Sequence, residues 1–583
     1  MDRYGLRMIP WNEKLEFDQY LLRAFIMNGF SFNAVANSFF TDFIRKLNPS
    51  YTPPDRMKFS RHCLMKELVH VEKQNESILI EASWLTLNLD GWTDQNNRSF
   101  YEFNLITEIR RAVVLALIDL SPHRHSAEFL LDRLQMVLQR VSTAFAVTSK
   151  IAAIVTDNPS VMQKLRNLFI AKPGHRHILA FRCFAHAINL IAGNFLCLFC
   201  MRHASTEKNG VDVIGDIVKH PVAFRIISKT TAITNYLNKS HHFKAKLKEE
   251  AARIKCAKET LDVIVVTRWT SVSDSLRSFL SLQTPLQTIV SMEKESLPAK
   301  VVNIISHRSF FTDIEHLYSI MKALAYAVSL IQSRSATLAD CYLILAYLYY
   351  VTSSCSKSSD HIEFHRYVSK VAKIRLDEYQ NPYYLACFYL HPKYRGAGLL
   401  SESRASVYRC IAEYSKLIGN SLSTTKNIIS ALQRYEIKVG PYSLIYHNSM
   451  YFVYYSSSFV FIYLIHLDDT PTTWWCMIKD TTHGNSLQQI ALRLLSITPH
   501  SVMPERLFSV LDWHHSKRRN RLSPFTLESI AKIHTFYKGN LSDPSVDVSF
   551  IEDALGDGLR SEDEHFDASH GDQIAEDFQL MIR

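Results

Sequence analysis

The spacing of apolar residues divides the chain into stretches with different periods. Over residues 14–78 apolar positions recur at helical spacing, with Leu22, Phe25 and Ile26 on one broad face. The prolines of NPSYTPPDR interrupt this pattern, because proline ends or kinks a helix. We therefore predict a helical N-terminal region over residues 14–78, preceded by an N-terminal extension of residues 1–13.

From residue 79 the period changes to that of β-strands. The runs WLTLNLDGW, SFYEFNLITEI and RAVVLALIDL are separated by short polar turns, which favour neighbouring antiparallel strands. A long amphipathic helix opened by Ser126, the strand IAAIVTDN, another helix and the strand HILAFRCFAH follow. The order βββαβαβ predicts an α/β core with a mixed sheet, the RNase H-like layout, whose first part spans residues 79–186.

Helical patterns dominate the rest of the chain. Residues 187–484 are rich in aromatic side chains and poor in glycine, which predicts a large all-α insertion domain. Short helices return over residues 485–542, the predicted last part of the core, where Ser523 can cap a helix whose first turn holds Pro524. The acidic, aromatic-poor residues 543–583 are predicted to be disordered.

Composition narrows the class of protein. At 583 residues the chain is too long for one core, so several domains are expected. The net charge is +10 although Glu552 to Asp577 hold ten acidic residues and one arginine, so the remainder is basic and suits a polyanion such as DNA. No secretory leader opens the chain, and apolar runs such as CYLILAYLYYV are too short to cross a bilayer. The ten scattered cysteines are then expected to be reduced thiols of a cytosolic or nuclear protein without a membrane partner.

Two aspartates at predicted strand ends carry the candidate chemistry. Asp90 follows an alternation of leucines, so it shares the opposite strand face with Thr86 and Asn88. Asp157 ends the later strand IAAIVTDN. Carboxylates that converge on one sheet edge suit Mg²⁺ or Mn²⁺, and two such ions about 3.5–4 Å apart can activate water and stabilise a leaving oxygen. The alternative is that each aspartate only caps a turn or helix.

A second group of residues resembles a zinc site. Cys183, His186, Cys197 and Cys200 have the spacing C-x₂-H-x₁₀-C-x₂-C. The intervening AINLIAGNFL is apolar and helical, unlike a zinc knuckle, so structural zinc is not expected. Near the C-terminus Lys517, Arg518, Arg519 and Arg521 offer dense positive charge for phosphate or nuclear import, with a solvated helix face as the alternative.

Several short motifs together resemble one family. DGWT, VTDNPSVM, CFAH, TRW and ERLFS occur in the order found in hAT-superfamily transposases, and LHPKYRG and KRRNRLSP are also similar to segments of that family. The resemblance covers residues from about 15 to about 540. Only ERLFS with its basic sequel is close to diagnostic by itself.

The resemblance implies roles for individual residues. Asp90, Asp157 and Glu505 match the metal-binding DDE positions, although Glu505 alone would be an ordinary helical glutamate. Trp269, with Arg268 beside it, resembles the aromatic residue that stacks on a DNA base, a contact worth ~1–3 kcal/mol, with a core tryptophan as the alternative.

Further residues are assigned by the same resemblance. His186 would contact DNA or orient a metal ligand, with a packed core histidine as the alternative reading. Residues 501–537 resemble a dimerisation region, implying a homodimer or higher oligomer.

The resemblance predicts a nuclear DNA transposase, or a transposase-derived protein, that cleaves and joins strands through its DDE triad. One departure keeps an alternative open. No cysteine and histidine ligands of a BED zinc finger precede Lys14, so either the gene model is truncated or specific DNA binding is lost or delegated. A catalytically inactive, domesticated descendant that acts as a dimeric nuclear DNA-binding or regulatory protein is that alternative.

Overall fold

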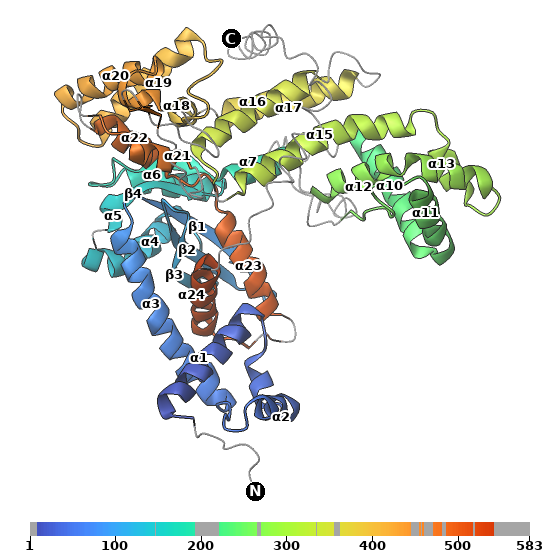
Figure 1. Cartoon of the computed structure of the whole chain (residues 1–583), viewed down its shortest axis with the longest axis horizontal. Coiled ribbons are helices and arrows are strands. Elements are labelled where there is room, and N and C mark those ends of the chain that lie inside the picture. The colour runs from blue at the N-terminus through green and yellow to red at the C-terminus, as the bar shows by residue number, and fades with distance from the viewer. Residues whose placement is uncertain are drawn as a thin grey trace. The chain divides into compact units, whose positions relative to one another are not determined.

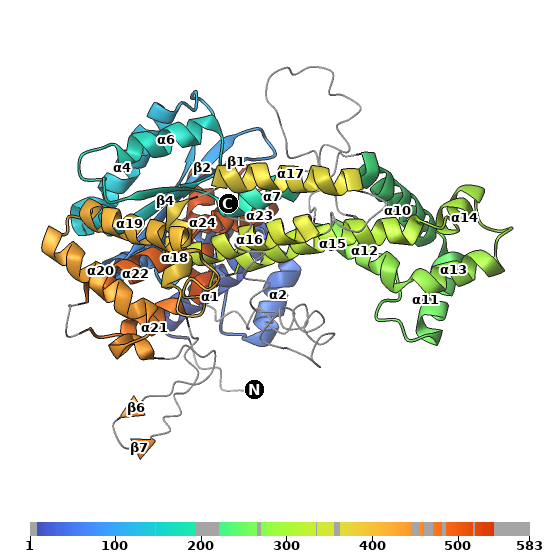
Figure 2. The same ribbon diagram turned by 90° about the horizontal axis from the view of Figure 1, so that it is seen from above.

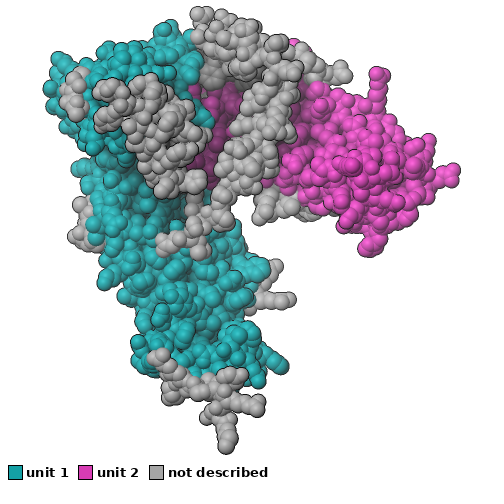
Figure 3. Space-filling model, viewed as in Figure 1, with its two compact units in different colours: residues 1–183, 390–580 teal, residues 184–389, 581–583 magenta. Residues whose placement is uncertain are grey.

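The computed structural model describes residues 9–145, 147–192, 221–264, 270–333, 335–354, 362–379, 381–444, 454–455, 458–459, 470–480, 485–516, 519 and 521–540. Two compact units are distinguished (Figure 3): Met1–Cys183 with Leu390–Leu580, and Phe184–Tyr389 with Met581–Arg583. The described residues are mostly helical, with one mixed five-stranded sheet in the first unit. The predicted α/β core with additional helical regions is confirmed at this level, whereas the predicted domain boundaries stay predictions.

The N-terminal half of the first unit contains helices followed by the sheet and its connections. Its elements are α1 (Trp11–Met27), η1 (Phe32–Ala36), α2 (Ser38–Leu47), η2 (Lys58–Cys63), α3 (Leu64–Glu81), β1 (Leu85–Thr93), β2 (Ser99–Thr107), β3 (Ala112–Asp119), α4 (Ala127–Phe145), α5 (Val147–Lys150), β4 (Ile151–Thr156), α6 (Ser160–Ile170) and β5 (Leu179–Arg182). The predicted cap of α4 is confirmed, since the Ser126 hydroxyl accepts a hydrogen bond from Phe129 N at 3.2 Å.

The C-terminal part of the chain, from Leu390, belongs to the first unit as well. Its elements are α19 (Ser401–Leu417), α20 (Leu422–Glu436), η4 (Gly440–Ser443), the short strands β6 (Tyr454–Tyr455) and β7 (Ser458–Phe459), α21 (Pro471–Met477), α22 (Ser486–Leu495), α23 (Val502–His514) and α24 (Pro524–Asn540). Ser523 caps α24, as predicted, by accepting from Thr526 N at 3.1 Å.

The sheet has the strand order β3-β2-β1-β4-β5. Figures 1 and 2 show β1, β2 and β4 of this sheet from two sides. β1, β2 and β3 form an antiparallel meander, as their short polar links predicted. β4 pairs with β1 in parallel, and β5 pairs in parallel with β4. The carboxyl ends of β1 and β4 therefore lie at the same edge of the sheet.

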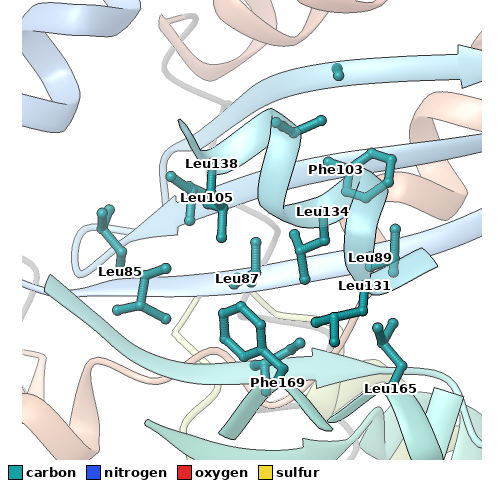
Figure 4. Packing of buried hydrophobic residues seen from close by; sticks show 14 of the residues in the cluster. Leu85, Leu87, Leu89, Phe103, Leu105, Leu131, Leu134, Leu138, Leu165 and Phe169 are labelled. Atoms are coloured by element: carbon teal, nitrogen blue, oxygen red, sulfur yellow. The ribbon is translucent and has the colours of Figure 1, made fainter. Parts of the chain in front are cut away.

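One face of the sheet packs on α4 and α6. Leu85, Leu87 and Leu89 of β1 point into this core, where they meet Leu134 of α4 and Phe169 of α6 (Figure 4). The alternation of leucines along β1 fixes this face, because successive side chains of a strand point to opposite sides.

The other face is covered near its edge by helices from both ends of the first unit. α24 packs on β3 and α3, and α23 packs on β1 (Figure 1). The core that they share joins Trp92 of β1 and Phe508 of α23 to Phe25 of α1. The N-terminal helices and the C-terminal helices are thus parts of one packed body.

Residues 390–396, LHPKYRG, have a structural role in the first unit. The Arg395 guanidinium lies 4.8 Å from the ring centroid of Tyr435 and 5.0 Å from that of Trp474, and it donates to Tyr442 O at 3.0 Å. Trp475 Nε1 donates to Leu390 O at 2.9 Å. This segment fastens α20 and α21 to each other.

The second unit contains helices and no strand within its described residues. Its helices are α7 (Phe184–Ala192), α10 (Pro221–Lys239), α11 (His241–Arg253), α12 (Thr270–Ser281), α13 (Gln283–Met292), α14 (Ala299–Ile305), α15 (Phe310–Ile331), α16 (Leu338–Ser354), α17 (Ile362–Tyr379) and α18 (Pro382–Leu390). By length and composition alone α15 could cross a membrane, but half of its apolar window is buried and it packs against α7, α12 and α16. These are the features of a core helix.

Candidate active site

Asp90 lies inside β1 and not at its end, which corrects the prediction from the sequence. β1 continues to Thr93 because it stays paired with β2, whereas its parallel pairing with β4 ends at Leu89 opposite Thr156. Asp157 directly follows β4. Asp90 and Asp157 are therefore the next residues after the last pair of the two parallel strands, and they lie at the same level of the sheet edge.

The charges of both aspartates affect the pKa of Tyr101 on β2. Tyr101 pairs with Gly91, and its ring lies over that glycine, where an added Cβ would come within 3.2 Å of Tyr101 Cζ. Burial, together with the charges of Asp157 and Asp90, raises the pKa of Tyr101. The negative charges of Asp90 and Asp157 thus both act on this phenol. A cation bound by the two carboxylates would offset their charge.

Glu505 lies in α23, which packs against β1, the strand that bears Asp90. Asn88 Nδ2 donates to His500 O at 3.2 Å, and the rings of Phe508 and Trp92 stack with centroids 5.8 Å apart. Residues 500–508 therefore run along β1 in the same direction as the strand, from the level of Asn88 to the level of Trp92. Glu505 lies between these two fixed contacts, as Asp90 does on the strand.

The segment before α23 is held on the polar face of β1. Thr498 N donates to Thr86 Oγ1 at 3.1 Å, and Arg110 donates to Thr498 Oγ1 at 2.9 Å. Ser501 N donates to the buried Cys183 thiol at 3.2 Å. Cys183 thus helps to fix the start of α23. Because Cys197 and Cys200 lie outside the described residues, the expectation of no zinc stays a prediction.

A buried polar stripe surrounds Asp90, and part of it was not predicted from the sequence. Thr86, Asn88 and Asp90 share the face that the leucine alternation predicted, and directly opposite on β2 lie Glu102 and Asn104. The signal was present, because these two polar residues alternate with apolar ones in SFYEFNLITEI. Asn104 Nδ2 donates to Glu102 Oε1 at 2.9 Å. Burial raises the pKa of Glu102 to about 8, against the hydrogen bond from Asn104 and with the added effect of the charge of Asp90.

Glu102 makes the stability of the first unit fall as pH rises. Its pKa is about 8 in the fold against an ordinary 4.5, so between these values the folded chain holds a proton that the unfolded chain has lost. We expect the native chain to lose on the order of 3–4 kcal/mol from about pH 5 to about pH 8 through this group. Glu102→Gln keeps the size and shape of the side chain but cannot lose a proton. The free energy of unfolding of this variant should therefore fall less over the same pH range.

The unfolding temperatures of the native chain and of Glu102→Gln, measured by calorimetry from about pH 5 to about pH 8, check the prediction. Glu402→Gln, at the exposed start of α19, is the matched control. Parallel pH profiles for the native chain and Glu102→Gln would contradict the raised pKa.

The far end of α23 is fastened to the β1–β2 turn. The buried Asp94 carboxylate accepts from Asn96 N, Arg98 N and Arg98 Nε at 2.8–2.9 Å. His515, next after α23, is fully buried, and Arg98 Nη2 lies 2.8 Å and Asn96 Nδ2 2.9 Å from its Nε2. Burial, helped by the charge of Arg98, lowers the pKa of His515, so the neutral ring accepts at Nε2.

The remaining predicted site residues are distributed differently. His186 lies in α7 of the second unit, whereas the three acidic residues belong to the first unit. Arg519 donates to Gly29 O, and Arg521 is exposed. Trp269, Arg268, Lys517 and Arg518 lie outside the described residues, so their predicted DNA contacts stay predictions.

The donors near Asp90 suit a hard divalent ion better than zinc. Asp90, Asp157 and Glu505 offer carboxylate oxygens, the ligands that Mg²⁺ and Mn²⁺ prefer. As the side chains stand in the described part of the chain, no three His, Cys, Asp or Glu residues gather closely enough to hold a metal ion. What the backbone does is bring the two aspartates to one level and lead Glu505 along the same strand.

Two family models match parts of the chain. Residues 54–217, which contain Asp90 and Asp157, match a family described as a domain of unknown function, DUF659. Residues 465–536, which contain Glu505, match the hAT family C-terminal dimerisation region. No curated protein matches the chain. The second match indicates association of the chain with copies of itself, and together the two matches support a hAT-family transposase-like protein.

Proposed function

We propose that the first unit has an RNase H-like core that cleaves and joins DNA strands as a hAT-type transposase. Asp90, Asp157 and Glu505 would hold two Mg²⁺ or Mn²⁺ ions. The observation that carries the proposal is the course of α23 along β1. It brings a glutamate from the C-terminal family match to the strand that bears Asp90, beside the strand that Asp157 follows.

The sheet supports an RNase H-like core. Three antiparallel strands precede two parallel ones, and the order is β3-β2-β1-β4-β5. α4 and α6 form the connections that lead to β4 and β5, and both cover the same face. α4 and α6 therefore do not cover the polar face of β1 that bears Asp90. α23, from a distant part of the chain, packs on β1 there.

The chemistry follows from the ligand type and from what surrounds it. Bound divalent ions would supply an activated water and charge stabilisation for the leaving oxygen of a phosphodiester. The chain's own part is to hold the carboxylates in place, since Asp90 is inside a paired strand, Asp157 directly follows β4, and Glu505 is on a helix fixed at both ends. Gly91 N donates to Asp90 Oδ1 at 2.8 Å and so limits the rotation of that carboxylate.

DNA is the proposed partner and the nucleus the proposed location. The positive net charge of the chain favours a polyanion, and the exposed Arg521 belongs to the basic segment that precedes α24. Trp269 and Arg268 remain proposed DNA contacts by family resemblance.

The proposal is tested with the full chain, Mn²⁺ and a supercoiled plasmid that carries the genomic sequences flanking the gene. Nicks at the flank boundary, hairpins on the flanking DNA and joined products are expected with Mn²⁺ and not with EDTA. Titration calorimetry with Mn²⁺ alone gives a second readout, and heat of binding at a two-to-one stoichiometry is expected. Absence of both cleavage and Mn²⁺ binding would favour a DNA-binding descendant without catalysis.

A further inference from the structure

Exposed apolar side chains gather in the N-terminal part of the first unit. Of the 26 large apolar side chains that are exposed among the described residues, eleven lie between Trp11 and Ile80. Single exposed apolar residues are ordinary, but a gathering of them on one region is typical of a contact surface.

Within this region α2 has the least cover. None of its residues is buried, and Phe39, Phe43 and Leu47, four residues apart along one stripe, are 83%, 57% and 68% exposed. The adjoining Phe40 faces the protein, with its ring centroid 5.6 Å from that of Phe25. α2 therefore rests on the core by one edge of its apolar face and leaves the other edge uncovered.

α2 is continuous with the C-terminal dimerisation region. Phe40 packs at the edge of the core to which α23 and α24 contribute. Trp513 of α23, which is 68% exposed and lies within the matched residues 465–536, packs against Gly29 in the turn between α1 and α2. His514 Nε2 lies 3.0 Å from Ile26 O in the last turn of α1. An interface that includes Trp513 would pass directly onto the turn between α1 and α2 and onto α2.

We propose that the uncovered face of α2, together with Phe30 and Trp513, binds the same face of a second copy of this chain. The two α2 helices would pair antiparallel about a two-fold axis near Phe43, so that one surface serves both copies. Asp42 precedes Phe43 and Lys46 follows it, so the antiparallel pair sets Asp42 of each copy near Lys46 of the other. Within each copy Arg45 Nη1 lies 3.7 Å from Asp42 Oδ1.

The size of the surface fits this occupant. Phe30, Phe39, Phe43, Leu47 and Trp513 expose about 600 Å² of side chain per copy, close to the roughly 800 Å² that each partner of a stable complex buries. Both family matches leave α2 outside their limits, at residues 54–217 and 465–536. The pairing does not depend on strand cleavage, so it can fail while the proposed chemistry stands.

Sedimentation equilibrium of the full chain tests the proposal. The double variant Phe39→Glu with Phe43→Glu is expected to raise the dimer dissociation constant at least about tenfold, because both rings are lost from each copy and the introduced carboxylates of the two copies would face one another. Both positions are exposed, so the unfolding temperature should stay native. Leu422→Glu, at the 66% exposed start of α20, is the matched control and should dissociate as the native chain does.

A cross-link tests the antiparallel arrangement. Phe43→Cys is expected to give a disulfide-linked dimer on mild oxidation, since position 43 lies near the proposed axis, and Leu422→Cys is not. A dissociation constant for the double variant within about twofold of native would overturn the interface. A raised constant without the cross-link would overturn the antiparallel pairing. Binding of the monomeric native chain to anionic lipid vesicles, lost in the double variant, would assign α2 to a membrane surface instead.

Discussion

Replacing Asp157 by asparagine is expected to lower the rate of Mn²⁺-dependent strand cleavage by about three orders of magnitude. Asparagine keeps the size of the side chain but removes the charge that would hold a metal ion beside Asp90. Loss of ~4 kcal/mol of transition-state stabilisation corresponds to such a factor, because each ~1.36 kcal/mol is tenfold in rate. Single-turnover cleavage of the flank-bearing plasmid measures the effect.

The same variant has two readouts that do not depend on cleavage. Affinity for Mn²⁺ should fall in calorimetric titration, because one of the hard oxygen ligands has lost its charge. The pKa of Tyr101 should also fall, since burial and the charges of Asp157 and Asp90 raise it in the native chain. A spectroscopic titration of the phenol follows this change in the absence of metal and DNA.

The control is an aspartate at the same sheet edge that belongs to no predicted metal site. Asp119 ends β3, which runs parallel to β1, and its Oδ1 accepts from Ser121 N at 3.0 Å. Asp119→Asn should cleave within about twofold of the native rate, well below the tenfold that ~1.36 kcal/mol would bring. Native cleavage by Asp157→Asn would remove this residue from the triad. Equal losses in both variants would point to a general effect of charge on DNA binding.

The local parts of the fold could be predicted from the sequence because they depend on neighbouring residues. The leucines of WLTLNLDGW and the polar residues between them assign the two faces of β1, since side chains alternate along a strand. Ser126 and Ser523 mark helix starts for an equally local reason, a hydroxyl within reach of free backbone N–H groups.

The contacts that assemble the candidate site could not be predicted in this way. Asn88 meets His500, and Trp92 meets Phe508, across most of the chain, and no local period encodes such a pairing. For this reason Glu505 was connected to Asp90 only through family resemblance. The leucine alternation before Asp90 predicts a strand end there, whereas pairing with β2 carries β1 on to Thr93.

The burial of Glu102 could not be predicted from the sequence for a different reason. Its alternation with Phe103 predicts that it faces away from the leucine core, and on most sheets that face is solvated. Here the face is covered by the segment before α23, whose Thr498 and His500 meet β1. The burial of Glu102 is therefore a consequence of tertiary structure, although the polarity of its strand face is a consequence of sequence.

Replacing Asp94 by alanine is expected to lower the free energy of unfolding of the first unit by about 2–4 kcal/mol, because the buried carboxylate is lost while its partner Arg98 stays 25% exposed. Its carboxylate, with no exposed side-chain area, accepts two backbone N–H groups and the Arg98 guanidinium, and His515 Nε2 lies 3.2 Å away. Alanine leaves these donors and the charge of Arg98 without their acceptor. Asp94→Asn restores an acceptor oxygen but no charge, so an intermediate loss is expected.

Burial alone would raise the pKa of Asp94, but hydrogen bonds from the backbone and side chain of Arg98 hold it below the usual 3.8. The contribution of this carboxylate is therefore complete above that value and is lost as pH falls through the lower folded pKa. Urea unfolding at neutral and acidic pH should show a large difference between the native chain and Asp94→Ala that shrinks in acid. Asp132→Ala, on an exposed side of α4, is the control.

Asp94 also links stability to the candidate site. The β1–β2 turn holds α23 through His515, and α23 carries Glu505, so loosening the turn should let that glutamate drift from Asp90. Asp94→Ala is thus expected to cleave DNA more slowly than Asp94→Asn even at temperatures where both remain folded. Equal cleavage by the two variants, with unequal stability, would mean that α23 keeps its position without this anchor and that the contacts of Asn88 and Phe508 alone fix Glu505.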